Sequence, residues 1–165
     1  MSVTSDILAL WRRPRPAFRA KLDEGLREDR AFAVLMAAAA LSFVAQWPAL
    51  ARAAHLRPEV PLDARMAGAL LGTVFLLPLL AYALAGFSHL AARLLGGRGS
   101  YYGARLALFW ALLAAAPGVL LGGLVAGLAG PGAAAMLAGV LVFAGFLRLW
   151  LSMLVEAESA GAAWT

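Results

Sequence analysis

A few polar side chains interrupt otherwise apolar segments of this chain, and they are the first candidates for chemistry. The four that lie in or beside the longest apolar segments are Gln46, His89, Arg105 and Arg148. Ionisable groups are costly to bury in a bilayer, so they often mark binding or transport sites. The two arginines could hold an anionic headgroup or pair with Glu156 and Glu158. Alternatively they anchor helix ends, because a long arginine side chain can reach the membrane surface.

Aromatic residues near these side chains extend the pattern. Tyr101 and Tyr102 lie about one helical turn before Arg105. Tyrosine and arginine are residue types found at the level of lipid headgroups. The predicted lipid or partner site at the cytoplasmic face therefore consists of Arg105, Arg148, Tyr101, Tyr102 and His89.

The sequence contains no recognisable catalytic or metal-binding pattern. Ser88 and His89 are adjacent, but neighbouring helix residues point in different directions, and no carboxylate in a helix is placed to orient the histidine. The chain has two histidines and no cysteine, and it lacks the HExxH spacing of a metalloprotease. The glycine-rich stretch 97–103 lacks the strand that precedes a phosphate-binding loop. We therefore predict a protein that is not an enzyme, with no catalytic residue, cofactor or metal site.

The composition indicates an integral membrane protein. Of the 165 residues, 63% are hydrophobic and only 14% are charged, whereas about a quarter of a soluble domain is charged. A chain of this length cannot bury so much apolar surface in its own core. The remaining apolar surface must therefore face lipid. The net charge of +5 could suggest a nucleic-acid partner, but the basic residues flank apolar runs. Membrane lipids explain them better, and no nucleic acid is expected.

Four uncharged or nearly uncharged segments predict four transmembrane helices, because roughly 20 apolar residues cross a bilayer. These segments cover about residues 31–51, 66–92, 104–128 and 132–155. Pro78 and Pro117 lie inside the second and third segments and are predicted to kink them. Trp47 and Trp150 are predicted interfacial anchors, since tryptophan concentrates at membrane surfaces. Residues 156–165 are expected to form a short flexible tail.

Residues 1–30 are polar and basic, and they predict one or two short amphipathic helices before the transmembrane domain. Phe18, Leu22 and Leu26 are spaced by four and would line one side of a helix. With Trp11 and Phe18 as anchors, such a helix is typical of a segment that lies in the membrane interface. The alternative is a helix that packs on the cytoplasmic end of the bundle. The predicted fold class is thus an all-α membrane protein of four transmembrane helices preceded by short amphipathic helices.

The distribution of basic residues predicts the orientation. Four spans place both termini on one side of the membrane. Eleven Arg and Lys residues lie on that side and three on the other, so the positive-inside rule puts both termini in the cytoplasm. We expect a multi-pass protein of the bacterial inner membrane.

Small residues recur four positions apart on the last two predicted spans. In lipid, small residues let helix backbones approach closely. Packing between helices of the same chain is one interpretation, and homo-oligomerisation or contact with another membrane protein is the other. The residues concerned are Gly118, Gly122, Gly123, Gly127 and Gly139.

Three stretches together resemble the bacterial members of the Yip (Ypt-interacting protein) membrane family. They are Leu-Trp-Arg-Arg-Pro-Arg-Pro-Ala-Phe at residues 10–18, Ser-Tyr-Tyr-Gly-Ala-Arg-Leu-Ala-Leu at 100–108 and Ala-Ala-Pro at 115–117. The resemblance implies a polytopic all-α membrane protein with a cytoplasmic N-terminus. In eukaryotic relatives it implies a role in vesicle traffic and binding of prenylated small GTPases. Here four spans replace the usual five, and the Asp-Leu-Tyr-Gly-Pro motif is absent.

Two functions from different classes remain open at this point. The first is a non-enzymatic scaffold that organises lipid or recruits a partner through its N-terminal segment. The second is a small transporter, channel or accessory subunit of a transport complex, because helices broken by proline can mark substrate sites. Transport needs a polar path, and few polar residues lie away from the predicted interfaces.

Overall fold

The computed structural model describes residues 3–159, and all regular structure in this range is helical. Two short helices come first, α1 (Val3–Arg12) and α2 (Pro14–Leu22). Helix α3 (Glu28–Leu56) follows, and then α4 (Leu62–Leu70), a π-helical segment η1 (Leu71–Leu76) and α5 (Leu77–Leu94) form one continuous helix. The described range ends with α6 (Tyr101–Ala129) and α7 (Ala133–Ser159). Residues 156–159 therefore belong to α7 and not to the predicted flexible tail, and the rest of that predicted tail, 160–165, lies outside the described residues.

Four helices in the described range are long and apolar enough to cross a membrane, which confirms the predicted fold class. They are α3, the continuous helix Leu62–Leu94, α6 and α7, with 29, 33, 29 and 27 residues. At about 1.5 Å per residue, each exceeds the roughly 30 Å hydrocarbon core. Most helix ends lie outside the predicted spans because the helices continue into charged or polar flanks such as Glu28 and His55.

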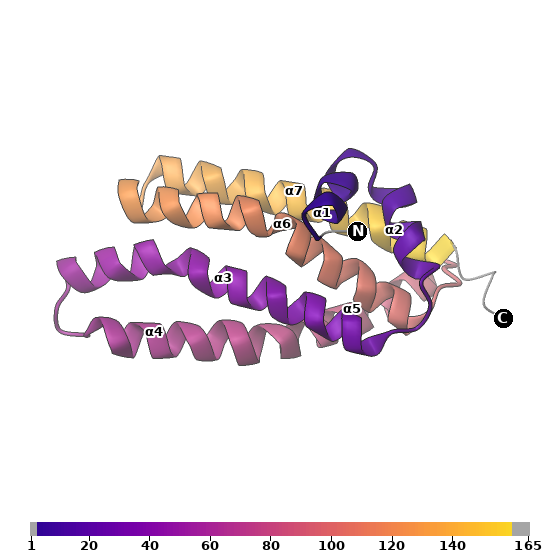
Figure 1. Ribbon diagram of the computed structural model, residues 1–165, viewed down its shortest axis with the longest axis horizontal. Helices are drawn as coiled ribbons and strands as arrows, with labels where there is room; N and C mark the ends of the chain where they lie inside the picture. The colour runs from indigo at the N-terminus through magenta and orange to yellow at the C-terminus, as the bar shows by residue number, and fades with distance from the viewer. Residues whose placement is uncertain (1–2, 160–165) are drawn as a thin grey trace.

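Helix α6 is the centre of the bundle, and α3 and α7 make its most extensive contacts (Figure 1). The first half of α6, from Tyr102 to Ala116, is almost entirely buried. The second half, beyond Pro117, is largely half-buried or exposed. The end of the bundle that carries the N-terminal helices therefore has a packed core, whereas the other end is open to its surroundings.

Two glycines of α6 allow the backbone of α3 to come close. A Cβ atom on Gly123 would overlap the carbonyl of Ala45, and one on Gly127 would overlap Pro48. Gly118 and Gly122 face Val142 of α7 across ordinary contact distances or slightly less. These four glycines do pack between helices of one chain, as the first interpretation of the pattern predicted.

Gly139 departs from that prediction. A Cβ atom on this residue would meet nothing within 4 Å, because Gly139 lines an apolar groove of about 390 Å³ between α3, α6 and α7. The fourfold spacing from Ala135 is present in the sequence, but this face of α7 lacks a partner helix among the described residues.

The two prolines behave differently from each other. Pro78 is the second residue of α5 and lies two positions after the π-helical segment Leu71–Leu76. Pro117 lies inside α6, which stays α-helical through it. The structure thus has a π-helical segment near Pro78 and continuous α-helix at Pro117, and the predicted kinks at the two prolines stay predictions.

The N-terminal helices pack against the bundle (Figure 1). Leu10 of α1 and Phe18 of α2 are fully buried in the hydrophobic core. The indole N–H of Trp11 donates a hydrogen bond of 2.8 Å to the carbonyl oxygen of Ala114 in α6. The prediction that Phe18 anchors the chain in the membrane interface is therefore wrong, because other helices cover its ring completely. Trp11 remains partly exposed.

Helix α2 is shorter than the helix predicted to carry Phe18, Leu22 and Leu26 on one side. Leu22 is its last residue, and Gly25 adopts a left-handed φ of 85° that turns the chain toward α3. Leu26 lies beyond this turn and is 78% exposed. The spacing of four therefore holds for Phe18 and Leu22 and does not extend to Leu26.

Candidate functional site

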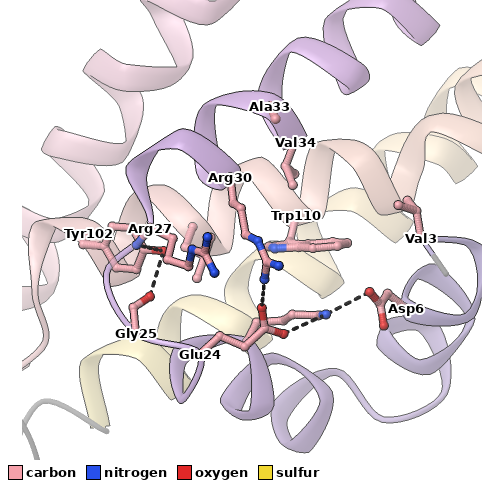
Figure 2. Close-up of a pocket in the computed structure, with 12 residues that line it drawn as sticks. Val3, Asp6, Glu24, Gly25, Arg27, Arg30, Ala33, Val34, Tyr102 and Trp110 are labelled. Atoms are coloured by element: carbon pink, nitrogen blue, oxygen red, sulfur yellow. Dashed lines mark hydrogen bonds and ion pairs between the residues drawn. The ribbon is translucent and has the colours of Figure 1, made fainter. Parts of the chain in front are cut away.

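A polar pocket lies beneath the N-terminal helices, where α1, α2, α3 and α6 meet (Figure 2). Its cavity volume is about 330 Å³. The polar side chains that line it are Asp6, Lys21, Glu24, Arg27, Arg30 and Tyr102. The apolar wall consists of Val3, Ala33, Val34, Leu106 and Trp110. The pocket combines the only lysine of the chain with two arginines and an aromatic wall.

Lys21 joins the charged groups on one side of the pocket. Its Nζ lies 2.8 Å from Asp6 Oδ2 and 3.2 Å from Glu24 Oε1. The other oxygen of Glu24 accepts a hydrogen bond of 2.6 Å from Arg30 Nη1. Dashed lines in Figure 2 mark these contacts at Asp6, Glu24 and Arg30. Both carboxylates thus have a cationic partner from the chain itself.

The ammonium group of Lys21 also lies over the indole ring of Trp110, 5.2 Å from the ring centroid. Burial alone would lower the pKa of Lys21, but the hydrogen bonds and charges of Asp6 and Glu24 outweigh burial and raise it. Lys21 is therefore a fixed cation at neutral pH. It holds α1 and α2 together over the wall of α6.

Arg27 is the cation of this pocket that lacks an acidic partner. Its backbone N–H donates a hydrogen bond of 3.1 Å to the Tyr102 hydroxyl, which itself donates to the Gly25 carbonyl at 3.4 Å. These bonds fix the turn between α2 and α3. The Arg27 side chain is exposed and makes no ion pair within residues 3–159.

The pocket lies where charged residues give way to apolar ones on two neighbouring helices. Arg30 is the last charged residue before the uncharged run of α3, and Arg105 has the same position on α6. Farther along the two helices, within their uncharged runs, the pocket wall is formed by Ala33, Val34 and Trp110. This polarity change matches the boundary between headgroups and acyl chains in a bilayer.

The five residues of the predicted site do not come together. Tyr102 lines the pocket, but Arg105 pairs with Glu28 at 2.5 Å and lies 5.7 Å from the ring centroid of Tyr82. Arg148 is exposed on α7, and its side chain has no charged partner in the described part of the chain.

His89 and Tyr101 belong to a separate cluster at the end of α5. The two rings lie 4.3 Å apart, and His89 Nδ1 lies 2.7 Å from Glu158 Oε1 in α7. The second oxygen of Glu158 accepts a hydrogen bond of 2.9 Å from the N–H of Gly99. His89 and Glu158 are only 2% and 8% exposed, and together they fasten the α5–α6 loop to α7.

This cluster corrects two expectations. A carboxylate does orient His89, and it comes from α7 rather than from the helix of the histidine. The acidic residues of α7 do not pair with Arg105 or Arg148, since Glu156 instead contacts Arg19 of α2 at 3.0 Å. Helix spacing could not reveal these partners because they are far apart along the chain.

The remaining predicted anchors lie in different environments. Trp47 is 46% exposed and packs its edge against Phe43, and its interfacial position stays a prediction. Trp150 stacks on Phe146 with ring centroids 5.8 Å apart. Its indole nitrogen is buried without a hydrogen-bond partner among the described residues, so its ring serves packing within the bundle.

The sequence pattern does not single out the pocket residues other than Tyr102, because the charges of the N-terminal segment indicate an amphipathic helix and an orientation but no partners. One signal was available. Asp6 and Leu10 are four residues apart, so they share a face of α1, and an acid on a buried face calls for a cationic partner. Lys21, the single lysine among fourteen basic residues, is that partner.

No group of three or more metal-ligating side chains occurs within residues 3–159. The hydroxyl of Ser88 donates to the Ala85 carbonyl at 2.9 Å, and no interaction joins it to His89 among the described residues. A set of cations above an apolar wall is suited to holding an amphiphilic anion.

Comparison with known proteins returned no matching family model, no matching curated protein and no matching solved structure. The class of protein is therefore defined by its helices, and it is a multi-pass helical membrane protein.

Proposed function

We propose that this protein is a non-enzymatic scaffold of the bacterial inner membrane, similar to Yip family members. It organises lipid or recruits a protein partner at the cytoplasmic face, with both termini in the cytoplasm. The observation that carries this proposal is the pocket of about 330 Å³ between the N-terminal helices and the start of the bundle. The pocket has a charged part near the starts of α3 and α6 and an apolar part within their uncharged runs. This combination fits a ligand at the membrane surface.

The way α1 and α2 are held supports this role. Their side chains reach into the bundle through Leu10, Trp11 and Phe18, while Lys21 ties them together across the pocket. A preformed pocket binds its ligand with little ordering cost. The N-terminal segment is therefore part of the binding surface.

A transporter, channel or transport subunit is the second candidate, and η1 favours it because an irregular membrane helix can mark a substrate site. The grooves beside η1 and α7 are lined almost wholly by apolar side chains, with Ser42 as the polar exception. A polar solute would find few partners there. The scaffold is therefore the better-supported function.

Photo-crosslinking tests the scaffold proposal. A photoreactive residue at Ala33, an exposed position in the pocket wall, should give one dominant lipid or protein adduct in bacterial membranes. Ala83, exposed on α5 and outside the pocket, is the control position and should yield only adducts that mirror bulk lipid. The same adduct profile at both positions would refute a ligand in the pocket.

A further inference from the structure

We infer that the pocket binds the phosphodiester of a singly anionic phospholipid from the cytoplasmic leaflet. This inference rests on the proposed function and specifies its ligand. The positive groups are Lys21, Arg27 and Arg30, and the negative groups are Asp6 and Glu24. Three cations against two carboxylates leave one positive charge, which a single phosphodiester neutralises.

The carboxylates already have their partners, so they are not vacant sites for a ligand ammonium group. Lys21 lies between Asp6 and Glu24 and over the Trp110 ring. Two acids and an aromatic face are the elements of an ammonium-binding cage, and the chain fills this cage with its own lysine. A zwitterionic headgroup would have to displace Lys21 from bonds of 2.8 and 3.2 Å.

The donors left for an anion belong to two arginines one helical turn apart at the start of α3. Arg27 has no acidic partner in the described range, and Arg30 uses Nη1 for Glu24. A guanidinium carries five N–H donors in a planar fork that matches phosphate oxygens. Arg27 and Arg30 can therefore hold a phosphodiester without breaking the ion pairs of Lys21 with Asp6 and Glu24.

The apolar wall of the pocket favours a lipid over a soluble phosphodiester. Leu106 and Trp110, one turn apart, lie in the first turns of the uncharged run of α6, and Val34 lies in the uncharged run of α3. An acyl chain that follows a phosphate bound at Arg27 would meet this apolar wall directly. A soluble headgroup offers nothing to this surface, so affinity should depend on the acyl chains.

Native mass spectrometry of the full chain in mild detergent tests the inference. Phosphatidylglycerol should be retained at least about fivefold more than phosphatidylcholine of the same chain length. Arg27→Gln should reduce its retention about tenfold, the effect of losing one charge-assisted interaction. Arg98→Gln is the matched control, because Arg98 is an exposed arginine at the same end of the bundle and outside the pocket, and it should change nothing.

Three results would overturn the inference. They are equal retention of the two lipids, equal effects of Arg27→Gln and Arg98→Gln, and displacement of the lipid by glycerophosphoglycerol, its deacylated headgroup, at equal concentration. A dominant protein adduct from Ala33 together with any of these would leave the scaffold proposal standing with a protein as ligand. Loss of the Ala33 adduct itself would remove the scaffold proposal as well.

Discussion

Gly123→Ala is expected to lower the thermal stability of the purified protein by about 5–10 °C. A Cβ atom here would overlap the carbonyl of Ala45 in α3, and backbone atoms cannot move aside as a flexible side chain can. Overpacking of this kind costs about 1–3 kcal/mol, which for a chain of 165 residues corresponds to several degrees in Tm. The readout is the unfolding midpoint in detergent.

Gly139→Ala is the matched control for this change. It adds the same methyl group to a membrane helix, where nothing lies within 4 Å. Alanine also favours the helix over glycine by about 1 kcal/mol, so the midpoint should stay or rise slightly. Equal losses in the two variants would show that α3 and α6 do not approach as closely as the structure shows.

Glu158→Ala is expected to be the most damaging single charge removal at the end of α7. It leaves His89, which is 2% exposed, without its carboxylate partner, and it removes the acceptor of the Gly99 N–H. Leaving buried hydrogen-bonding groups without their acceptor costs about 1–3 kcal/mol each. Thermal unfolding should show this loss, and trypsin should cleave faster after Arg98 in the loosened loop.

Glu156→Ala provides the comparison, since it removes a glutamate only two residues earlier in α7. Its partner Arg19 is 57% exposed, and pairs of this kind contribute about 0–1 kcal/mol. The change should therefore leave both stability and trypsin cleavage near those of the unaltered chain. If Glu156→Ala proved as harmful as Glu158→Ala, the buried His89–Glu158 pair would not have the role described.

The four membrane helices could be predicted because their signal is local. Each is a run of apolar residues long enough to cross a bilayer, and no knowledge of neighbouring helices is needed to detect it. Their ends could not be predicted as well, since helix continuation through Glu28 or His55 depends on capping and contacts outside the apolar run. The π-helical segment Leu71–Leu76 was not predicted, because a proline within an apolar run indicates only a kink.

The pocket could not be predicted, because it is made by segments that meet only after folding. Asp6, Lys21 and Arg30 come from three helices, and Trp110 comes from a fourth. The pairing of His89 with Glu158 joins residues 69 positions apart. Periodicity assigns such residues to a helix face, but it does not say which element covers that face.

The central claim is that the N-terminal helices and their pocket lie on the cytoplasmic side of a four-span bundle. The chain has no cysteine, so single cysteines can be introduced at Ala20 in α2 and at Glu59 in the α3–α4 loop, both exposed. The measurement is labelling by a membrane-impermeant maleimide in bacterial spheroplasts. Glu59→Cys should react at once and Ala20→Cys only after permeabilisation, whereas immediate labelling of Ala20→Cys would contradict the account.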